Sequence, residues 1–436
     1  MLTGEQTIKI LGKYLLLDGF GIVFDFKKSH GSWMYDLRGK REILDLGYNH
    51  FSSHTLAYNH PGLKEKKYLE KLKEVSEFRV ALSDVYHPYQ AEFVQEFSKI
   101  LPKGFNHLFF VDNGAPAVEN ALKVAFDWKT RKNGGLEADL VIHFRDAFHG
   151  RLGYTLSLTN TADPRKYLYF PKFKEWPRIH NPKAKFDSQG KLLGYEDEGK
   201  AIEEINEAIE KYGKRIAALI IEPVQGEGGD NYFNPSFFKE LRNICDQKEI
   251  MLIFDEVQTG WSLGDWWASG TKIAGGVLPD VFAFSKKTQQ AGIAANSRVD
   301  EVEKNVFQES SRINSTWGGN LPDMVRATQY IRIIKKEKLH KNVLKQGAYL
   351  KKLFSEEDLK IDNLRGVGGW LAFDLPTPEL RDIVWKKAFE LGCLVLKCGV
   401  KSIRIRLNLS VTKEEIEKGY EILREAIKET WKTQHY

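Results

Sequence analysis

Two short apolar runs near the middle of the chain each lead to a residue capable of acid–base or nucleophilic chemistry. The run at 251–254 (M-L-I-F) is followed by Asp255, and the run at 281–284 (V-F-A-F) leads through a serine to Lys286. Short apolar runs bounded by polar residues are typical of buried strands in a parallel sheet. Ligands bind beyond the carboxyl ends of such strands. The stretch between the runs is long enough for a crossover, so Asp255 and Lys286 are predicted to face one crevice.

A carboxylate and an amine in one crevice suit pyridoxal phosphate. The lysine would form a Schiff base with the cofactor, and the carboxylate would keep the pyridine nitrogen protonated so that the ring withdraws electrons. The spacing of Asp255 and Lys286 leaves an alternative open, because aspartate and lysine also end strands in proteins without this chemistry.

A third feature is a glycine-bearing turn between an apolar run at 107–111 and a predicted helix at 116–129. The turn contains Gly114 and Ala115, and Pro116 opens the helix. Backbone N–H groups at a helix N-terminus, left accessible by small residues, form an anion site. The sequence therefore indicates a phosphate site, and an ordinary strand-to-helix turn is the alternative.

Other residues that follow predicted strands are candidates for contact with a ligand. Phe148 comes after the run at 139–144 and can stack on a pyridine ring, while Arg151 can hold a carboxylate through two hydrogen bonds. Glu222 and Glu227 flank a glycine-rich turn, and at least one of them is expected to face the crevice. For Glu222 we favour a capping or ion-pair role.

Two further segments lie towards the C-terminus. In N-S-T-W-G-G-N, the hydroxyl of Thr316 and the neighbouring backbone N–H groups can bind a phosphate. In I-R-I-R, Arg404 and Arg406 are two residues apart and share one face of a predicted strand at 403–407. We expect Arg406 to be solvated at the edge of its sheet.

The strings F-D-E-V-Q-T-G, D-V-F-A-F-S-K and G-A-P-A-V-E-N-A-L-K resemble the cofactor site of class III aminotransferases. The resemblance extends over roughly residues 20 to 430. It implies fold type I of the pyridoxal-phosphate-dependent transferases, with a doubly wound, mostly parallel α/β sheet in a large domain and a smaller α+β domain from both termini. It also implies a homodimer with shared active sites, in which Thr316 reaches the phosphate bound by the partner subunit.

The resemblance implies a role for each candidate residue. Lys286 carries the cofactor and shuttles a proton, and the adjacent Lys287 turns away from the crevice. Glu227 pairs with Arg404 while an ω-amine is bound and releases it for 2-oxoglutarate, and Arg151 holds the far carboxylate of the substrate. The implied catalytic residues are Lys286, Asp255 and Glu227; the cofactor-binding residues are Gly114, Ala115, Phe148, Asp255, Gln258, Lys286 and Thr316; and the substrate-binding residues are Arg151, Glu227, Gln258 and Arg404.

Longer strings, such as A-F-H-G-R-L-G-Y-T-L-S-L-T-N-T and G-E-G-G-D, are similar to family members that act on the terminal amine of lysine. They imply transfer of the ε-amino group of L-lysine to 2-oxoglutarate, giving 2-aminoadipate 6-semialdehyde and L-glutamate. The chain departs from the family at 261–267, 288–296 and 407–409, which border the site, so 4-aminobutyrate and ornithine stay open as alternative amine donors. A regulatory protein that binds the cofactor without turnover is a further alternative, which the intact catalytic residues disfavour.

The composition limits the remaining function classes. The chain has 436 residues, enough for two to three domains, and its 65 basic and 59 acidic residues give a net charge of only +6. Because the charges are interspersed, no nucleic-acid partner is expected. The three cysteines suggest neither a disulfide framework nor a metal site, so a reducing cytoplasm is expected. We also expect no export signal and no membrane-spanning segment.

Alternating apolar runs and helical patterns from about 105 to 300 predict the doubly wound domain. Three parts are predicted: an N-terminal segment 1–60 with an antiparallel meander at 20–49 (strands at 22–24, 32–36 and 43–46), a large cofactor-binding domain 61–325, and a C-terminal α+β domain 326–436. Residues 161–198 show no regular pattern, which predicts a long surface excursion of a kind that is often functional.

Overall fold

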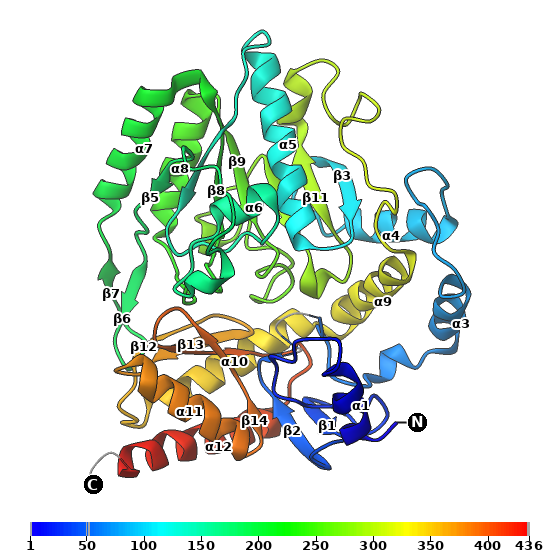
Figure 1. The fold of residues 1–436 in the computed structure, drawn as a ribbon, viewed down its shortest axis with the longest axis vertical. Coiled ribbons are helices and arrows are strands. Elements are labelled where there is room, and N and C mark those ends of the chain that lie inside the picture. Colours follow the sequence, from blue (N-terminus) through cyan, green and yellow to red (C-terminus); the bar gives the residue numbers. More distant parts are fainter. Residues whose placement is uncertain (1, 49, 51–52, 434–436) are drawn as a thin grey trace.

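The computed structural model describes residues 2–48, 50 and 53–433. Residue 49, the last of the predicted meander, and the outermost residues of the predicted terminal segments lie outside this description. The chain forms two lobes, one built around a large sheet and one that contains both described ends of the chain (Figure 1).

The larger lobe contains a seven-stranded, mostly parallel sheet. Its spatial order is β3 (Phe105–Val111), β11 (Ala291–Asn296), β10 (Val281–Phe284), β9 (Met251–Asp255), β8 (Ile216–Ile221), β4 (Leu140–Phe144) and β5 (Arg178–Ile179). Neighbours from β10 to β5 run parallel, whereas β11 runs antiparallel to both β10 and β3. All residues of β8, β9 and β10 are buried, which explains their uninterrupted apolar sequence and confirms the predicted α/β fold.

Strand β11 was not predicted, because its sequence A-G-I-A-A-N is rich in alanine and glycine, which have weak strand preference. In the structure it lies between β3 and β10, and all but its last residue are buried. The small side chains allow close packing there: a Cβ at Gly292 would lie 2.4 Å from the carbonyl oxygen of Phe109. Burial on both sides of the strand therefore outweighs its local preference.

Helices cover this sheet. α5 (Gly114–Lys132) packs against β8, β10 and β11, while α7 (Glu198–Tyr212) contacts β5 and α8 (Pro235–Gln247) contacts β9. α5 begins just after the carboxyl end of β3, so its first turn lies at the same edge of the sheet as the polar residues that follow β9.

The smaller lobe joins segments from the two ends of the sequence. β1 (Trp33–Asp36) pairs antiparallel with β2 (Arg41–Asp45), and β14 (Cys393–Leu394) pairs parallel with β2. A four-stranded sheet has the order β12 (Asp362–Arg365), β13 (Trp370–Asp374), β16 (Ser402–Arg406) and β15 (Leu396–Cys398). The helices of this lobe include α1 (Gly4–Leu11), α10 (Leu339–Ser355), α11 (Pro378–Glu390) and α12 (Lys413–Thr433) (Figure 1), and α12 packs against α10 and α11.

Some details of the predicted organisation differ from the structure. The strand predicted at 22–24 is reduced to a single bridge between Phe24 and Asp36. α9 (Leu321–Glu337) runs continuously through the predicted boundary at 325, and the positions of both domain boundaries stay predictions. α9 packs against α3 (Lys66–Val75) and α4 (Pro88–Ser98).

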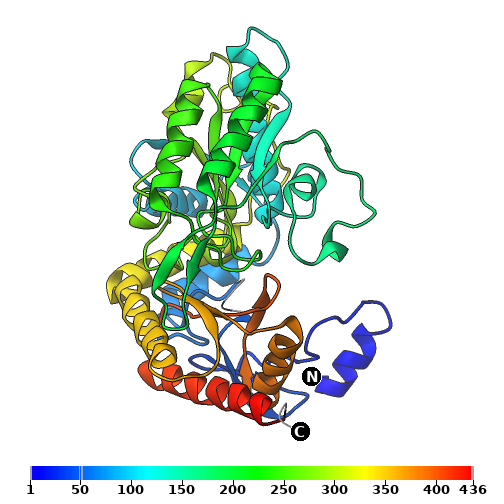
Figure 2. The same ribbon diagram turned by 90° about the vertical axis from the view of Figure 1, so that its left-hand side faces the viewer.

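The excursion at 161–198 was predicted to lack regular structure, and this was wrong for its second half. β5 adds to the large sheet, and β6 (Ala184–Phe186) and β7 (Leu192–Tyr195) form a hairpin. The first half follows α6 (Gly153–Leu158), contains a short 3₁₀ turn at Pro164–Lys166, and projects from the side of the larger lobe (Figure 2). Within the described ranges, no helix combines the length and apolarity needed to span a bilayer.

Candidate active site

The carboxyl ends of β9 and β10 bring Asp255 and Lys286 to one edge of the sheet. Asp255 is paired in register with Ala283 of β10, and Glu256 donates its N–H to the Ala283 carbonyl at 2.9 Å. Lys286 follows two residues after β10 and has a positive φ of 55°. A non-glycine residue in this left-handed region is strained by about 1–3 kcal/mol, and such strain is concentrated at functional sites.

The charges around Lys286 favour a reactive amine. Burial of the amine and, next in size, the charge of Arg404 lower the pKa of Lys286 to about 8, although Glu227 and Asp255 oppose this. These three groups therefore act electrostatically on Lys286, and among them Asp255 is the residue for which the strand ends predicted a crevice shared with Lys286. A lower pKa increases the fraction of neutral, nucleophilic amine near neutral pH.

The adjacent Lys287 has different surroundings. Its Nζ donates to the carbonyl of Leu407 at 3.1 Å, and its own carbonyl accepts a hydrogen bond from Thr55 at 2.6 Å. Burial and the neighbouring charge of Arg406 lower the pKa of Lys287 to about 7. Lys287 is thus held against the smaller lobe.

Asp255 is held by a residue whose role sequence reasoning missed. His149 Nδ1 lies 2.7 Å from Asp255 Oδ2, and the N–H of Val257 donates to Asp255 Oδ1 at 3.0 Å. No role was predicted for His149, because no local pattern relates this histidine to a carboxylate at the end of another strand. The contact with His149 orients the Asp255 carboxylate and fixes its position at the edge of the sheet.

The predicted phosphate turn opens α5. The N-cap residue Asn113 makes no side-chain hydrogen bond to the first turn, so the N–H groups there are available to an anion. A Cβ at Gly114 would lie 2.8 Å from Val257 Cγ1, and one at Gly150 would lie 2.7 Å from the Cβ of Ala115. Small residues are therefore needed where these turns meet.

Two residues near this turn affect how it could bind a phosphate: the acidic Asp112 and the hydroxyl-bearing Thr316. Asp112 forms an ion pair with Arg79 at 2.5 Å, and the Arg79 guanidinium lies 4.1 Å from the centre of the Trp317 ring. The Asp112 carboxylate is thus compensated near a predicted phosphate site. Thr316 is exposed, and its carbonyl accepts a hydrogen bond from the Ser83 hydroxyl at 2.9 Å.

Glu222 has the structural role that we favoured. Its carboxylate accepts the backbone N–H of Phe148 at 2.9 Å and that of Gly226 at 3.2 Å, so it ties two loops together. Burial and, to a lesser degree, Asp255 raise the pKa of Glu222 well above its ordinary value. The backbone that carries the Phe148 ring is thereby held to the turn that follows β8.

Glu227 links two cations from distant parts of the chain. Its Oε2 lies 2.5 Å from Arg404 Nη2, and its Oε1 lies 2.5 Å from the Nζ of Lys166. Burial alone would raise the pKa of Glu227, but the charges of Arg404 and Lys166 hold it well below its ordinary value. The pair Glu227–Arg404 was expected. Lys166, from the projecting excursion, was not, because nothing in the local sequence A-D-P-R-K-Y distinguishes it from a surface lysine.

The two remaining arginines behave differently. Arg151 is exposed, and its guanidinium lies 6.0 Å from the centre of the Phe148 ring. Arg406 was predicted to be solvated at a sheet edge, and this was wrong: β16 is an inner strand, and Arg406 forms two hydrogen bonds to the buried carboxylate of Asp230. The Arg406 guanidinium also lies 3.6 Å from the centre of the Trp370 ring.

These residues fit pyridoxal phosphate. An amine, a carboxylate, an aromatic ring and an uncapped helix N-terminus are arranged around one edge of the sheet. Two buried polar atoms there, Gln258 Oε1 and His149 Nε2, have no hydrogen-bond partner within the described part of the chain. A Cβ at Gly226 would lie 2.1 Å from Gln258 Oε1, so this glycine is needed for the glutamine to lie where it does.

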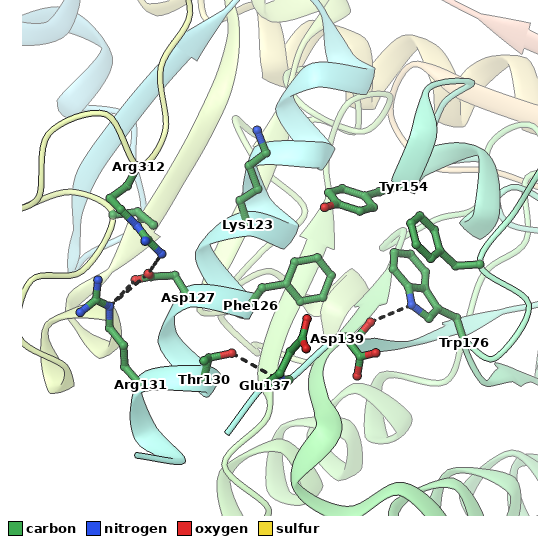
Figure 3. Close-up of a pocket in the computed structure, with 13 residues that line it drawn as sticks. Lys123, Phe126, Asp127, Thr130, Arg131, Glu137, Asp139, Tyr154, Trp176 and Arg312 are labelled. Atoms are coloured by element: carbon green, nitrogen blue, oxygen red, sulfur yellow. Dashed lines mark hydrogen bonds and ion pairs between the residues drawn. The ribbon is translucent and has the colours of Figure 1, made fainter. Parts of the chain in front are cut away.

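A cavity of about 670 Å³ lies farther along α5 (Figure 3). Asp127, at its wall, is thirteen residues beyond Gly114, or roughly 20 Å along the helix axis. Asp127 pairs with Arg131 at 3.1 Å and also with Arg312, so its carboxylate is compensated. This cavity is separate from the candidate active site.

Known proteins share this architecture. Residues 19–427 match the family model Aminotransferase class-III. The L-lysine-epsilon aminotransferases of Mycobacterium tuberculosis and Streptomyces clavuligerus are 40% and 38% identical to the chain; both alignments cover 98% of it, and they cover 96% and 95% of those proteins. A solved structure of lysine aminotransferase from M. tuberculosis in the internal aldimine form has a TM-score of 0.92 at 40% identity, covering 98% of this chain and 100% of that one. The chain belongs to the class III aminotransferases.

Proposed function

We propose that this enzyme transfers the ε-amino group of L-lysine to 2-oxoglutarate, giving 2-aminoadipate 6-semialdehyde and L-glutamate. The names of the two relatives above support lysine as the amine donor, since the alignments span nearly the whole of each protein. The observation that carries the proposal is the ion pair between Glu227 and Arg404, which compensates the arginine whose charge acts on Lys286 while leaving Arg151 exposed.

Pyridoxal phosphate, when bound, supplies an electron-withdrawing ring that stabilises negative charge on the carbon that carries the amine. Asp255, oriented by His149, would hold a proton at the ring nitrogen. The first turn of α5 around Gly114 and Ala115 would bind the phosphate. Phe148 would cover one face of the ring, and Gln258 would lie beside the ring hydroxyl.

Lys286 has the central role in the chemistry. Its lowered pKa allows the neutral amine to accept a proton from the amine-bearing carbon of the substrate. The protonated amine can then donate this proton to a second carbon, so that Lys286 acts as a general base and then as a general acid. Its backbone adopts a strained conformation with positive φ, and the Nζ of Lys287 is held by a hydrogen bond to the Leu407 carbonyl.

Two carboxylate sites explain how one pocket accepts two different substrates. Lysine presents its ε-amine, so its carboxylate lies far from the reacting carbon, where Arg151 can bind it. 2-Oxoglutarate presents its α-carbon, so its α-carboxylate lies near Arg404 and its far carboxylate near Arg151. During the lysine half-reaction Arg404 stays paired with Glu227, which avoids a buried uncompensated charge.

One assay tests the proposal. Purified enzyme with pyridoxal phosphate and 2-oxoglutarate is offered lysine, ornithine or 4-aminobutyrate, and the glutamate formed is measured. We expect the highest kcat/KM with lysine. A higher value with ornithine or 4-aminobutyrate would assign the enzyme to another ω-amine, and no turnover with any of them would favour a cofactor-binding protein without catalysis.

We further propose a homodimer with shared active sites. Thr316 is exposed in the single chain and lies in a glycine-rich turn suited to a phosphate, which supports a contact with the cofactor of a partner subunit. A Thr316→Ala chain mixed with a Lys286→Ala chain would place both lesions in one site of each mixed dimer and leave the other site intact. Activity should therefore return on mixing. Proven subunit exchange without any return of activity would contradict sharing.

A further inference from the structure

We propose that Lys166 is a positioning residue that holds Glu227 when Arg404 is released to the α-carboxylate of the keto acid. The inference rests on the proposed exchange of Arg404 between Glu227 and a substrate carboxylate. Lys166 is a third charged group in this exchange, and it provides the partner for the Glu227 carboxylate after Arg404 leaves.

The geometry of Glu227 allows one partner to leave while the other stays. Arg404 donates a hydrogen bond to Oε2 and Lys166 donates one to Oε1, each at 2.5 Å. The two bonds therefore do not compete for one oxygen. Loss of the Arg404 contact leaves the Lys166 contact geometrically intact.

The burial of the three groups makes this partner important. The side chains of Arg404, Lys166 and Glu227 are 3%, 16% and 21% exposed, so water replaces little of a lost ion pair. A carboxylate removed from water without a partner is strongly disfavoured. Lys166 therefore lowers the free energy needed to open the Glu227–Arg404 pair, which is required only when 2-oxoglutarate or glutamate binds.

The local fold holds Lys166 at this place. It ends the 3₁₀ turn at Pro164–Lys166, where the Asp163 carboxylate accepts the N–H of Arg165 at 3.2 Å and the N–H of Leu168 donates to the Pro164 carbonyl at 2.8 Å. Its ammonium also lies 5.7 Å from the centre of the Phe148 ring. The turn thus points the lysine into the site although its segment projects from the lobe.

The far end of the same segment is anchored as well (Figure 3). Trp176 donates its indole N–H to the Asp139 carbonyl at 2.8 Å and stacks on Phe173, with ring centres 5.1 Å apart. The N–H of Phe173 donates to the Ser157 hydroxyl at 2.9 Å. Because the segment is fixed on both sides of Lys166, the ion pair with Glu227 belongs to a built site.

The test compares two half-reactions in single turnovers, using Lys166→Met, the charge-preserving Lys166→Arg and a control, Lys174→Met, at an exposed lysine of the same segment. We expect Lys166→Met to weaken the apparent affinity for glutamate and 2-oxoglutarate by about tenfold or more, while its lysine half-reaction changes by less than about threefold. Lys166→Arg should restore the affinity, and Lys174→Met should match the unaltered enzyme.

A binding measurement gives a readout that does not depend on turnover. Glutarate has the length and both carboxylates of 2-oxoglutarate but no ketone, and its binding is measured by calorimetry. Lys166→Met should weaken glutarate binding by about the same factor as it weakens 2-oxoglutarate binding.

Two results would overturn the inference. Equal losses with lysine and glutamate would show that Lys166 binds the far carboxylate that both substrates carry. No loss with either would show that the ion pair has no part in the exchange. A failure of the proposed function can be distinguished from a failure of this inference. If the unaltered enzyme does not accept lysine, the glutamate half-reaction and glutarate binding still decide the role of Lys166.

Discussion

Two arginines on β16 pair with two carboxylates of the turn that follows β8, and the two ion pairs differ in the exposure of the carboxylate and in the number of hydrogen bonds. Arg406 and Asp230 are each 1% exposed and share two hydrogen bonds, of 2.7 and 2.5 Å. Arg404 makes one hydrogen bond to Glu227, whose second oxygen is taken by Lys166.

The surroundings explain the difference. Arg406 stacks on Trp370, and the carbonyl of Asp230 also accepts a hydrogen bond from Arg365 at 3.1 Å, so both partners are held by additional contacts. Glu227 is 21% exposed and has two cationic partners. A fully buried pair that is held by neighbouring groups stabilises the fold, whereas a pair whose carboxylate has a second cationic partner can exchange.

Each arginine also faces a different lysine of the same dipeptide. Arg404 lowers the pKa of Lys286, and Arg406 lowers that of Lys287, in both cases after the larger effect of burial. The exchangeable pair is therefore coupled to the reactive amine, and the fixed pair to its structural neighbour. Four changes test this contrast.

The largest effect is expected on stability. Arg406→Met leaves the Asp230 carboxylate buried without its partner, which should reduce the free energy of unfolding by about 3–5 kcal/mol. Arg404→Met should cost about 1–2 kcal/mol, because Glu227 keeps Lys166. The midpoints of urea unfolding measure both. If Arg404→Met were the more damaging change, the division into fixed and exchangeable pairs would be wrong.

Glu227→Ala should separate the two half-reactions. Arg404 would lose the carboxylate of Glu227 during the lysine half-reaction, which should slow this half-reaction by more than about tenfold. The glutamate half-reaction needs Arg404 free, so it should be spared. Single-turnover rates with each substrate test this; equal slowing would make Glu227 a structural residue.

Arg151→Ala should affect both half-reactions alike. Each substrate presents a far carboxylate to Arg151, and losing its charged hydrogen bonds should reduce kcat/KM by about tenfold or more for lysine and for glutamate. Arg145→Ala, an exposed arginine just before this loop, is the matched control. A loss confined to one substrate would show that the far carboxylate of the other substrate binds to a different residue.

The smallest effect is a shift in pH dependence. Capture of pyridoxal phosphate by the apoenzyme requires neutral Lys286, so its rate should rise with pH through a midpoint of about 8. Arg404→Met removes a charge that lowers this pKa, so the midpoint should move to higher pH. Arg406→Met should leave it in place. Absorbance of the bound cofactor follows the capture, and a midpoint that stays unchanged in Arg404→Met would show that the two groups are not coupled.

Much of this enzyme was predictable from its sequence because the signals are local. Uninterrupted apolar runs indicated the parallel strands, and the residue that follows such a run lies at the carboxyl edge of the sheet. Asp255 and Lys286 could be assigned to one crevice on that basis. Gly114 and Ala115 could likewise be assigned to a helix N-terminus, because short-range backbone geometry decides both.

Tertiary structure alone decided which charges meet. Lys166, Glu227 and Arg404 come from a surface excursion, a turn and a strand of the other lobe, and no periodicity relates positions so far apart in the chain. His149 and Arg406 show the same limit. An arginine in a polar-looking strand becomes an inner, buried residue only because a carboxylate and an indole ring from other segments lie against it, and charge pairing depends on distance in space rather than in sequence.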